Sequence, residues 1–570
     1  MYHRAIRFCV LVCLLGSVHA GIGVAHAASH AETHGTEGMV AARSRLAALA
    51  GAQILQQGGN AVDAAVATGF ALAVTYPSAG NLAGGGFMVI RLVDGTVVTN
   101  DHRERAPAGA ERDMFQNEAG DVVPGLSTAS HLAAGVPGTV DGLLDVLERY
   151  GTRSVEQVIA SALDYAERGF VLDYDLANDI ERALPELRKH PSSIAVFTKK
   201  DGTAYREGEV FRQPDLAKTL QRIAELGRKG FYAGKTAELI EAEMRRGGGL
   251  ISAADLADYD SVWREPIRGT YRGYDVFSMP PPSSGGVLLV QMLNMLEPFD
   301  VGGMGWGSAE TVHLMVEAER RAYADRAEFL GDPDFVDVPV SRLTDKTYAR
   351  RRFADFDPAR AIRSADVDAG QWPEESPETT HVSVMDAAGN AVAYTTTLNL
   401  SFGSKIVVEG TGMLLNNEMD DFSSKENTPN AYGLIGRDAN AIAPGKRMLS
   451  SMAPTIVVKD KAPLLVTGSP GGSTIITTVL QVVVNTLDHG MSLSDAVGLP
   501  RFHHQWLPDR VIFEPYGLSP DTRRLLEAKG HTLVPLPEGR GIGDANSVKR
   551  EGSELLGMSD PRNDGSAVGF

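Results

Sequence analysis

Residues 377–400 read PETTHVSVMDAAGNAVAYTTTLNL, and this stretch decides the fold of the 570-residue chain. Two alternating runs are joined by Gly389-Asn390, a pattern that predicts a β-hairpin. Residues 355–378 are rich in Pro, Asp, Glu and Ser and lack apolar periodicity, as is typical of a linker. Two threonines stand where this linker meets the hairpin. They mark either a strand entering a sheet or a cut before Thr379.

A cut before Thr379 would change what its hydroxyl can do. Threonine is a poor nucleophile until a base takes its proton, and an N-terminal threonine carries its own base, the α-amine. An unperturbed α-amine titrates near pH 8, so an appreciable fraction is neutral at physiological pH. An internal Thr379 has no such base. A flexible linker is also where a break costs the fold least.

The period of a strand places polar side chains of the hairpin in two rows. One face carries Thr379, His381 and Ser383, and one face of the returning strand carries Thr395, Thr397 and Asn399. Two such rows can line one cleft. Threonine-rich strands are also common for reasons of β-propensity alone, so the pattern leaves both interpretations open.

A second glycine-rich stretch, GSPGGS at residues 468–473, lies between a predicted strand and a predicted helix. Backbone N–H groups and the start of a helix make such a turn suited to an anion or an oxyanion. The stretch lacks the Gly-Lys-Ser/Thr ending of a phosphate-binding loop. A tight turn that needs only small residues remains the alternative.

Other polar residues carry little information singly. His503 and His504 are adjacent on an extended segment, point to opposite faces and have no matched ligand cluster, so we expect structural roles. Five more polar residues lie beside apolar, strand-like runs: Arg103, Glu418, Asp421, Ser450 and Ser451.

The rest of the chain predicts a mixed α and β protein. We expect helices over 40–57 and from there to about Ala73, interrupted at 58–60, and then two strands that turn at Asp94-Gly95. Residues 130–360 are mostly helical in pattern. Residues 463–487 predict a buried strand, a glycine turn and a helix.

Composition excludes several classes of function. The net charge of −18 disfavours nucleic acid and anionic membranes, and we find no basic run that would override it. Residues 1–27 have the basic start, apolar run and Ala-His-Ala end of a signal peptide. An uncleaved anchor is the alternative, but the apolar run from Cys9 to Leu15 is too short to span a bilayer. Both cysteines, Cys9 and Cys13, lie in that segment, so the mature chain would have no thiol.

Taken together, these motifs closely resemble those of the bacterial γ-glutamyltranspeptidases, members of the N-terminal nucleophile hydrolase superfamily. The resemblance runs nearly end to end and in the family's order. It includes GGNAVDAAVATGFALAV, AGNLAGGGFM, PPPSSGG, YADRAEFLGDPDF, TTHVSVMD, LLNNEMDDF, SSMAPTIV, TGSPGGS and PRFHHQWLPD.

The resemblance implies an α+β fold, a four-layer αββα sandwich made as one inactive precursor. The precursor would cut itself between Glu378 and Thr379 into a large subunit, residues 28–378, and a small catalytic subunit, residues 379–570. The two would stay associated. Export through the signal peptide would place the protein in the periplasm or outside the cell.

The resemblance also implies a role for each matching residue. Thr379 would attack the γ-carbonyl of glutathione or another γ-glutamyl compound, and water or an amino acid or dipeptide acceptor would take the γ-glutamyl group. Gly471 and Gly472 would hold the oxyanion and Thr397 would orient Thr379. The substrate carboxylate would meet Arg103, Ser450 and Ser451, the ammonium would meet Asn399, Glu418 and Asp421, and Tyr432 would cover the site. Neither a metal ion nor a cofactor is expected.

Two residues depart from the pattern of bacterial relatives in this family, although Glu at the first of these positions occurs elsewhere in the family. Glu418 stands where they carry Gln, which adds a negative charge near the expected ammonium site, and His102 stands where an aromatic residue often precedes the arginine. Two other functions stay open. A cephalosporin or glutaryl acylase of the same fold would leave Asp421 without an ammonium partner. An inactive periplasmic binding relative would keep the pocket without being cut.

Overall fold

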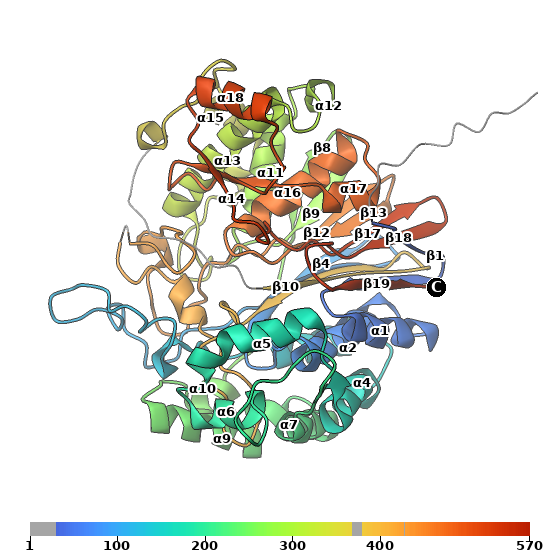
Figure 1. Cartoon of the computed structure of the whole chain (residues 1–570), viewed down its shortest axis with the longest axis vertical. Coiled ribbons are helices and arrows are strands. Elements are labelled where there is room, and N and C mark those ends of the chain that lie inside the picture. Colours follow the sequence, from blue (N-terminus) through green and yellow to red (C-terminus); the bar gives the residue numbers. More distant parts are fainter. Residues whose placement is uncertain (1–29, 368–378, 427) are drawn as a thin grey trace, which may run out of the picture.

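The computed structural model describes residues 30–367, 379–426 and 428–570, and among these residues two seven-stranded sheets lie face to face (Figure 1). The first sheet has the order β1 (Thr33–Gly35), β18 (Glu554–Met558), β17 (Ser547–Glu551), β13 (Ala462–Thr467), β12 (Thr455–Lys459), β9 (Tyr274–Ser278) and β8 (Ile267–Tyr271). The second has the order β19 (Ser566–Gly569), β2 (Gly38–Ala42), β10 (Thr380–Asp386), β11 (Ala391–Thr397), β3 (Gly85–Arg91), β4 (Val97–His102) and β7 (Val262–Arg264).

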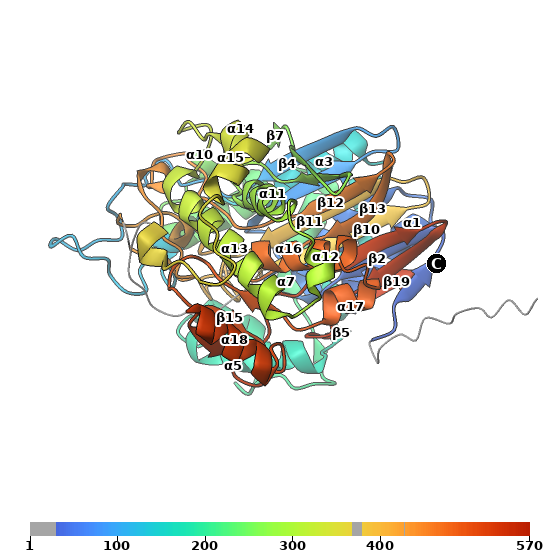
Figure 2. The ribbon, with the colours of Figure 1, turned by 90° about the horizontal axis from the view of Figure 1, so that it is seen from above.

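Helices cover both outer faces of this pair of sheets (Figures 1 and 2). One face is covered by α1 (Arg45–Gln56), α2 (Ala61–Thr75), α4 (Val155–Arg168), α5 (Tyr174–Leu187) and α7 (Pro214–Leu226). The other is covered by α11 (Gly285–Leu296), α13 (Ala309–Phe329), α16 (Thr474–Leu487) and α17 (Leu493–Gly498). The order helix, sheet, sheet, helix is the αββα sandwich that the resemblance implies.

Other elements connect these layers. Two of the remaining elements are as long as the layer helices: α3 (Thr139–Tyr150), which packs on β3 and β4, and α9 (Gly234–Gly247). The short ones are η1 (His131–Ala133), β5 (Phe170–Val171), α6 (Pro191–Phe197), β6 (Val210–Phe211), α8 (Lys229–Tyr232), α10 (Ala253–Ala257), α12 (Val301–Met304), α14 (Val340–Leu343), α15 (Lys346–Arg352), η2 (Ser364–Val367), η3 (Glu418–Asp421), η4 (Asp438–Asn440), β14 (Phe502–His503), β15 (Val511–Phe513), α18 (Pro520–Lys529) and β16 (Leu533–Pro535).

The predicted hairpin lies at the centre of the second sheet. β10 and β11 pair antiparallel with Thr380 opposite Thr396 and His381 opposite Thr395. Every residue of both strands is buried, because one face packs on helices and the other on the first sheet. The apolar side chains between the sheets form a separate core, to which Met385, Val89 and Ile456 belong.

The sandwich interlaces the parts of the chain before and after Thr379. β2 and β3 come from the earlier part and flank the hairpin of the later part on either side. In the first sheet, β9 of the earlier part pairs with β12 of the later part. Neither part has a complete sheet of its own, so two fragments cut before Thr379 would still share both sheets.

Two sequence-based predictions need correction. The helix expected over 40–57 begins at Arg45, and Gly38–Ala42 form β2, because the sheet needs a strand beside β10 and this overrides helix propensity. The region 130–360 also contains β7, β8 and β9, whose short sequences VWR, IRGTY and YDVFS are too brief to show a clear strand period. The helix expected up to Ala73 is confirmed as α2, which begins with a capping box between Asn60 and Asp63.

Several predictions concern parts of the chain outside the described residues. The signal peptide, the linker from 368 onward and Glu378 all lie there. Among the described residues, no helix is both long enough and apolar enough to cross a membrane.

Candidate active site

Thr379 lies at the start of β10, where its hydroxyl faces Thr397 at the end of β11. The two Oγ atoms are 3.5 Å apart, at the long end of hydrogen bonding, and both residues are almost fully buried. Thr397 Oγ also accepts a hydrogen bond from the Asn399 N–H at 2.7 Å. This bond holds Thr397 Oγ in place as the acceptor of the Thr379 hydroxyl proton.

Asn81 fixes the end of β11 and was not predicted from the sequence. Its Nδ2 donates to the Thr397 carbonyl at 2.8 Å, and its Oδ1 accepts from the Gly84 N–H at 2.9 Å. The side chain therefore ties the glycine turn before β3 to the strand that carries Thr397. Asn81 lies in the AGNLAGGGFM motif, so the sequence signal was present although its role was not apparent.

His381 is the histidine nearest to Thr379 along β10, but it is unsuited to act as its base. Its ring nitrogens are engaged by Thr395 Oγ at 2.8 Å and Ser383 Oγ at 3.0 Å. Burial lowers the pKa of His381 to about 3. An imidazole with so low a pKa is a poor acceptor for the proton of a threonine hydroxyl at neutral pH.

The glycine turn expected to hold an oxyanion leads into α16. Gly471 and Gly472 have φ values of +135° and +54°, which L side chains rarely adopt. The N-cap Ser473 does not cap α16 with its side chain, and its Oγ donates to Gln505 Oε1 at 2.6 Å instead. The backbone N–H groups at the start of this 14-residue helix are thus not capped by that hydroxyl.

Tyr432 closes the same turn from the other side. Its hydroxyl donates to the Asn399 carbonyl, and its ring lies so close to Gly472 that a Cβ there would be 2.3 Å from Tyr432 Cδ1. Only glycine fits at residue 472 while the tyrosine is in this position. Tyr432 therefore lies over both the turn and the end of β11.

Arg103 is the central charge of the site and is bound by protein carboxylates. Its Nη1 contacts Glu418 Oε1, and its Nη2 contacts Asp421 Oδ2 at 2.5 Å. Glu104 lies 3.7 Å from the same guanidinium. The three carboxylates come from two segments about three hundred residues apart in the chain.

One arginine faces three buried carboxylates, so the cluster favours retention of a proton. Burial raises the pKa of Glu418 well above its ordinary value, and the nearby Glu104 carboxylate raises it further, against the opposing effect of Arg103. Burial likewise raises the pKa of Glu104 to about 7 and raises the pKa of Asp421. Burial and the neighbouring carboxylates thus favour the protonated form of Glu418, whereas Arg103 favours the charged form.

Two serines and a second arginine complete the wall beside Arg103. Ser450 Oγ accepts from the Met452 N–H at 3.1 Å, and Ser451 Oγ accepts from Arg326 Nη2 at 3.3 Å. Because each serine oxygen accepts a hydrogen bond in these contacts, each hydroxyl can still donate its own proton to another acceptor. Arg326 was not singled out from the sequence, although it lies in the YADRAEFLGDPDF motif. Its pKa is lowered by burial to about 10.

Two buried acceptor atoms in this wall have no hydrogen-bond partner among the described residues. They are Asn399 Oδ1 and Glu418 Oε2. Asn399 has φ +73°, a left-handed conformation that asparagine tolerates, and its Nδ2 donates to the Asn417 carbonyl at 2.9 Å. Buried acceptors without partners are costly, so these two atoms fit a ligand that brings N–H donors.

One cavity collects nearly all of the predicted site residues. It is lined by Arg103, Thr379, Thr397, Asn399, Glu418, Asp421, Tyr432, Leu434, Ser450, Ser451, Met452, Gly472 and Ile475. We call it the nucleophile cavity. Gly471 lies next to this lining without being part of it, and Glu378 lies outside the described residues. The cavity measures only about 20 Å³, and Arg103 and the two carboxylates that it contacts form part of its wall.

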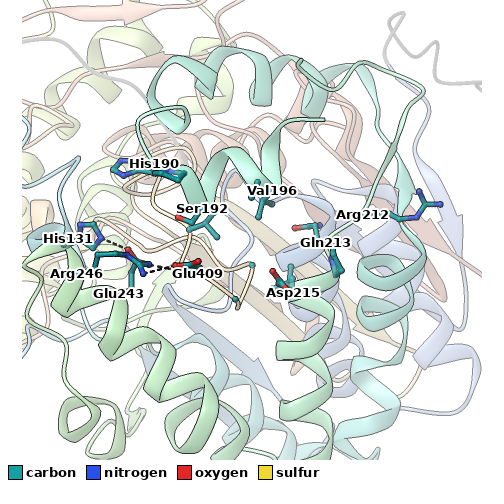
Figure 3. A pocket seen from close by; sticks show the side chains of 18 residues that line it. His131, His190, Ser192, Val196, Arg212, Gln213, Asp215, Glu243, Arg246 and Glu409 are labelled. Carbon is teal, nitrogen blue, oxygen red and sulfur yellow. Dashed lines mark hydrogen bonds and ion pairs between the residues drawn. The ribbon is translucent and has the colours of Figure 1, made fainter. Parts of the chain in front are cut away.

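A much larger cavity, about 570 Å³, lies among the helices and contains none of the predicted residues (Figure 3). Four of its charged groups pair with one another. Glu243 is bound by His131 Nε2 at 2.9 Å and by Arg246, which also contacts Glu409 at 2.9 Å. Size alone therefore does not identify the site.

The histidine pair is structural, as expected. His503 Nδ1 contacts Thr477 Oγ at 2.8 Å, and His504 Nδ1 accepts from the Trp506 N–H at 3.0 Å. Burial lowers the pKa of His503 to about 4 and that of His504 to about 3. His102 is also fully buried and packs against Tyr394, with the two ring centroids 5.6 Å apart.

The arrangement of this site can be compared with known proteins. The family model described as Gamma-glutamyltranspeptidase matches residues 47–570. The chain belongs to the γ-glutamyltranspeptidase family. A glutathione hydrolase proenzyme of Escherichia coli (strain K12) is 53% identical over 528 residues, which cover 92% of this chain and 90% of that protein. One of Pseudomonas sp. (strain A14) is 44% identical over 578 residues, covering 100% and 99%.

Solved structures agree with the family and the fold. The cephalosporin acylase from Bacillus halodurans has a TM-score of 0.85 at 28% identity and covers 96% of this chain and 98% of its own. The γ-glutamyltranspeptidase of Helicobacter pylori has a TM-score of 0.57 at 48% identity and covers 57% of this chain and 93% of its own. Since both a transpeptidase and an acylase share the architecture, the residues of the site must decide between their substrates.

Proposed function

We propose that this chain is a γ-glutamyltransferase and glutathione hydrolase. Residues 28–378 and 379–570 form its large and small subunits after the chain cuts itself before Thr379. The observation that carries the substrate class is the wall of the nucleophile cavity. Arg103 and two serine hydroxyls suit a carboxylate, and the unpartnered Asn399 Oδ1 and Glu418 Oε2 suit an ammonium. Together they suit a free α-amino acid head, the part that γ-glutamyl compounds share.

The proposed reaction has two steps. In the first, the α-amine of Thr379 takes the proton of its own hydroxyl, the Oγ attacks the γ-carbonyl, and the amine of the substrate leaves with a proton. Backbone N–H groups of Gly471 and Gly472 stabilise the oxyanion. In the second, water or an acceptor amine attacks the γ-glutamyl ester and releases Thr379.

Substrate binding must rearrange the charges around Arg103. The glutamyl carboxylate takes the guanidinium, and the glutamyl ammonium takes the two carboxylates that Arg103 releases, Glu418 and Asp421. Each buried charge thus exchanges one partner for another and none is left unpaired. The same exchange opens the small cavity for the glutamyl group.

The second candidate is an acylase, since a cephalosporin acylase shares the architecture. A glutaryl group has the carboxylate but no ammonium, so it would leave Glu418 and Asp421 without the partner that replaces Arg103. Rates of p-nitroaniline release from γ-glutamyl-p-nitroanilide and from glutaryl-p-nitroanilide separate the two functions. We expect kcat/KM to be at least about 100-fold higher for γ-glutamyl-p-nitroanilide than for glutaryl-p-nitroanilide, and we expect Asp421→Asn to reduce this difference. Equal rates, or a preference for the glutaryl compound, would support the acylase.

A further inference from the structure

A third cavity, about 590 Å³, lies beside the oxyanion turn and is built differently from the first two. Its walls are mainly apolar, made by Ile512, Val534, Pro535, Leu536, Pro537 and Ile542. Two arginines, Arg510 and Arg540, also line it, and no acidic residue is among its described lining residues. We call it the arginine-lined cavity.

The two guanidinium groups set the charge of this cavity. Many arginines of the described chain lie within 4.0 Å of a carboxylate, as Arg524 does of Asp521. Neither Arg510 nor Arg540 forms such an ion pair among the described residues. Arg510 is half-buried at the start of β15 and Arg540 is exposed on the loop after β16. In a chain of net charge −18, two arginines without a carboxylate partner on an apolar surface favour an organic anion with an apolar body.

The arginine-lined cavity and the nucleophile cavity both adjoin the turn that contains Gly471 and Gly472. Thr474 lines the former, and its hydroxyl donates to the Gly471 carbonyl at 2.8 Å. Gln505 also lines it, and its Nε2 donates to the Tyr432 carbonyl at 3.3 Å. Gly472 and Tyr432, the direct neighbours of these groups, line the nucleophile cavity.

We propose that the arginine-lined cavity binds the amino acid or dipeptide that accepts the γ-glutamyl group, an inference that rests on the proposed function. Arg510 and Arg540 hold the free carboxylate of the acceptor, and the apolar walls hold an apolar side chain. The absence of carboxylates from the lining also fits, because the acceptor amine must lose its proton before it attacks and a nearby carboxylate would favour the ammonium.

The step that follows is a simple acyl transfer. The neutral acceptor amine attacks the ester carbonyl on Thr379, a C–N bond forms, the bond between the carbonyl carbon and Thr379 Oγ breaks, and one amine proton returns to Oγ. Departure of the amine product from the donor is the reverse of this attack. One cavity therefore serves both the amine that leaves and the amine that arrives.

The test compares two acceptors that differ only at the carboxylate. With γ-glutamyl-p-nitroanilide as donor, KM is measured for L-phenylalanine and for L-phenylalaninamide by quantifying the γ-glutamyl products. We expect Arg510→Gln and Arg540→Gln each to raise the KM for L-phenylalanine, divided by the KM for L-phenylalaninamide, roughly tenfold. This is the size of effect typical for the loss of a charged hydrogen bond. Arg524→Gln, an exposed arginine away from the cavity, should leave this ratio unchanged.

Two results would overturn the proposal. The first is an unchanged ratio in both cavity variants, including the case in which both KM values rise by the same factor, since a damaged fold does not distinguish a carboxylate from an amide. The second is a rise in the ratio of the same size in Arg524→Gln, because the effect would then not depend on the cavity. Failure of the proposed function itself would look different. The unaltered protein would then release no p-nitroaniline from the donor at all.

Discussion

The guanidinium of Arg103 and the carboxylate of Glu418 form an ion pair in which each side chain is only 1% exposed. Asp421 binds the other end of the same guanidinium. The groups proposed to recognise the two charges of a substrate thus neutralise each other. A zwitterionic head can replace these contacts without leaving a buried charge unpaired, whereas a ligand with one charge cannot.

The proton held by this cluster makes donor binding depend on pH. Burial raises the pKa of Glu418 above its ordinary value and raises the pKa of Glu104, beside the same guanidinium, to about 7, so a proton on this cluster competes with the incoming ammonium. We therefore expect KM for γ-glutamyl-p-nitroanilide to fall as the pH rises from about 6 to 7.5, and Glu418→Gln to flatten this dependence. Initial rates across this range measure it. A variant as steep as the unaltered protein would show that Glu418 does not hold the proton.

Glu104 should make the fold itself sensitive to pH. Burial raises its pKa from 4.5 to about 7, and neither of its oxygens has a hydrogen-bond partner among the described residues. An acid whose pKa is raised by folding lowers the free energy of unfolding as the pH rises from 4.5 to about 7, by up to about 3 kcal/mol in total. We expect Glu104→Gln to raise the melting temperature at pH 8 and to change it little near pH 4.5.

The control for this prediction is an exposed glutamate. Glu554→Gln, at a side chain that is 59% exposed, should follow the unaltered protein at both pH values. If Glu104→Gln melts lower than the unaltered protein at pH 8, the buried carboxylate is stabilised by its contact with Arg103 and the sign of the argument is wrong.

Thr379→Ala should leave a single uncut chain whose turnover is lower by at least about 10³-fold, because self-cleavage and acyl transfer both use the missing hydroxyl. Thr379→Ser restores a hydroxyl and should recover two fragments and part of the activity. Thr203→Ala, in an exposed turn, serves as the matched control. Intact mass and p-nitroaniline release give both readouts. Two fragments from Thr379→Ala would place the nucleophile elsewhere.

Tyr432 is proposed to keep water from the γ-glutamyl ester. Its ring covers Gly472, and its hydroxyl is bonded to the Asn399 carbonyl. Tyr432→Ala should raise the ratio of hydrolysis to transfer roughly threefold to tenfold, measured with and without glycylglycine. Tyr516→Ala removes a tyrosine that is 90% exposed and should leave the ratio unchanged. A lower ratio in Tyr432→Ala would mean that the ring hinders acceptors more than water.

Local patterns predicted the hairpin and the relative position of its threonines well. Period-two alternation placed Thr379 and Thr397 on facing rows, and the structure brings their hydroxyls to 3.5 Å. Glycine content and position likewise predicted the turn before α16. The strand β2 escaped prediction because its short apolar sequence is compatible with a helix until the partner strand β10 is known.

The wall of the nucleophile cavity around Arg103 could not be derived from local patterns. Arg103 and Asp421 are more than three hundred residues apart, and nothing in either segment indicates that they touch. Resemblance to a family placed both residues in one substrate site, but it did not predict the contact between them. Asn81 and Arg326 were missed for a related reason, since each acts by holding another group of the site and its partners lie in distant segments.

The central claim is that Thr379 becomes a nucleophile by becoming an N-terminus. N-terminal sequencing of the purified, active protein tests it most directly. We predict two N-termini, one of which gives Thr-Thr-His-Val, in a preparation that releases p-nitroaniline from γ-glutamyl-p-nitroanilide. An active preparation in which no chain begins at Thr379 would contradict the account.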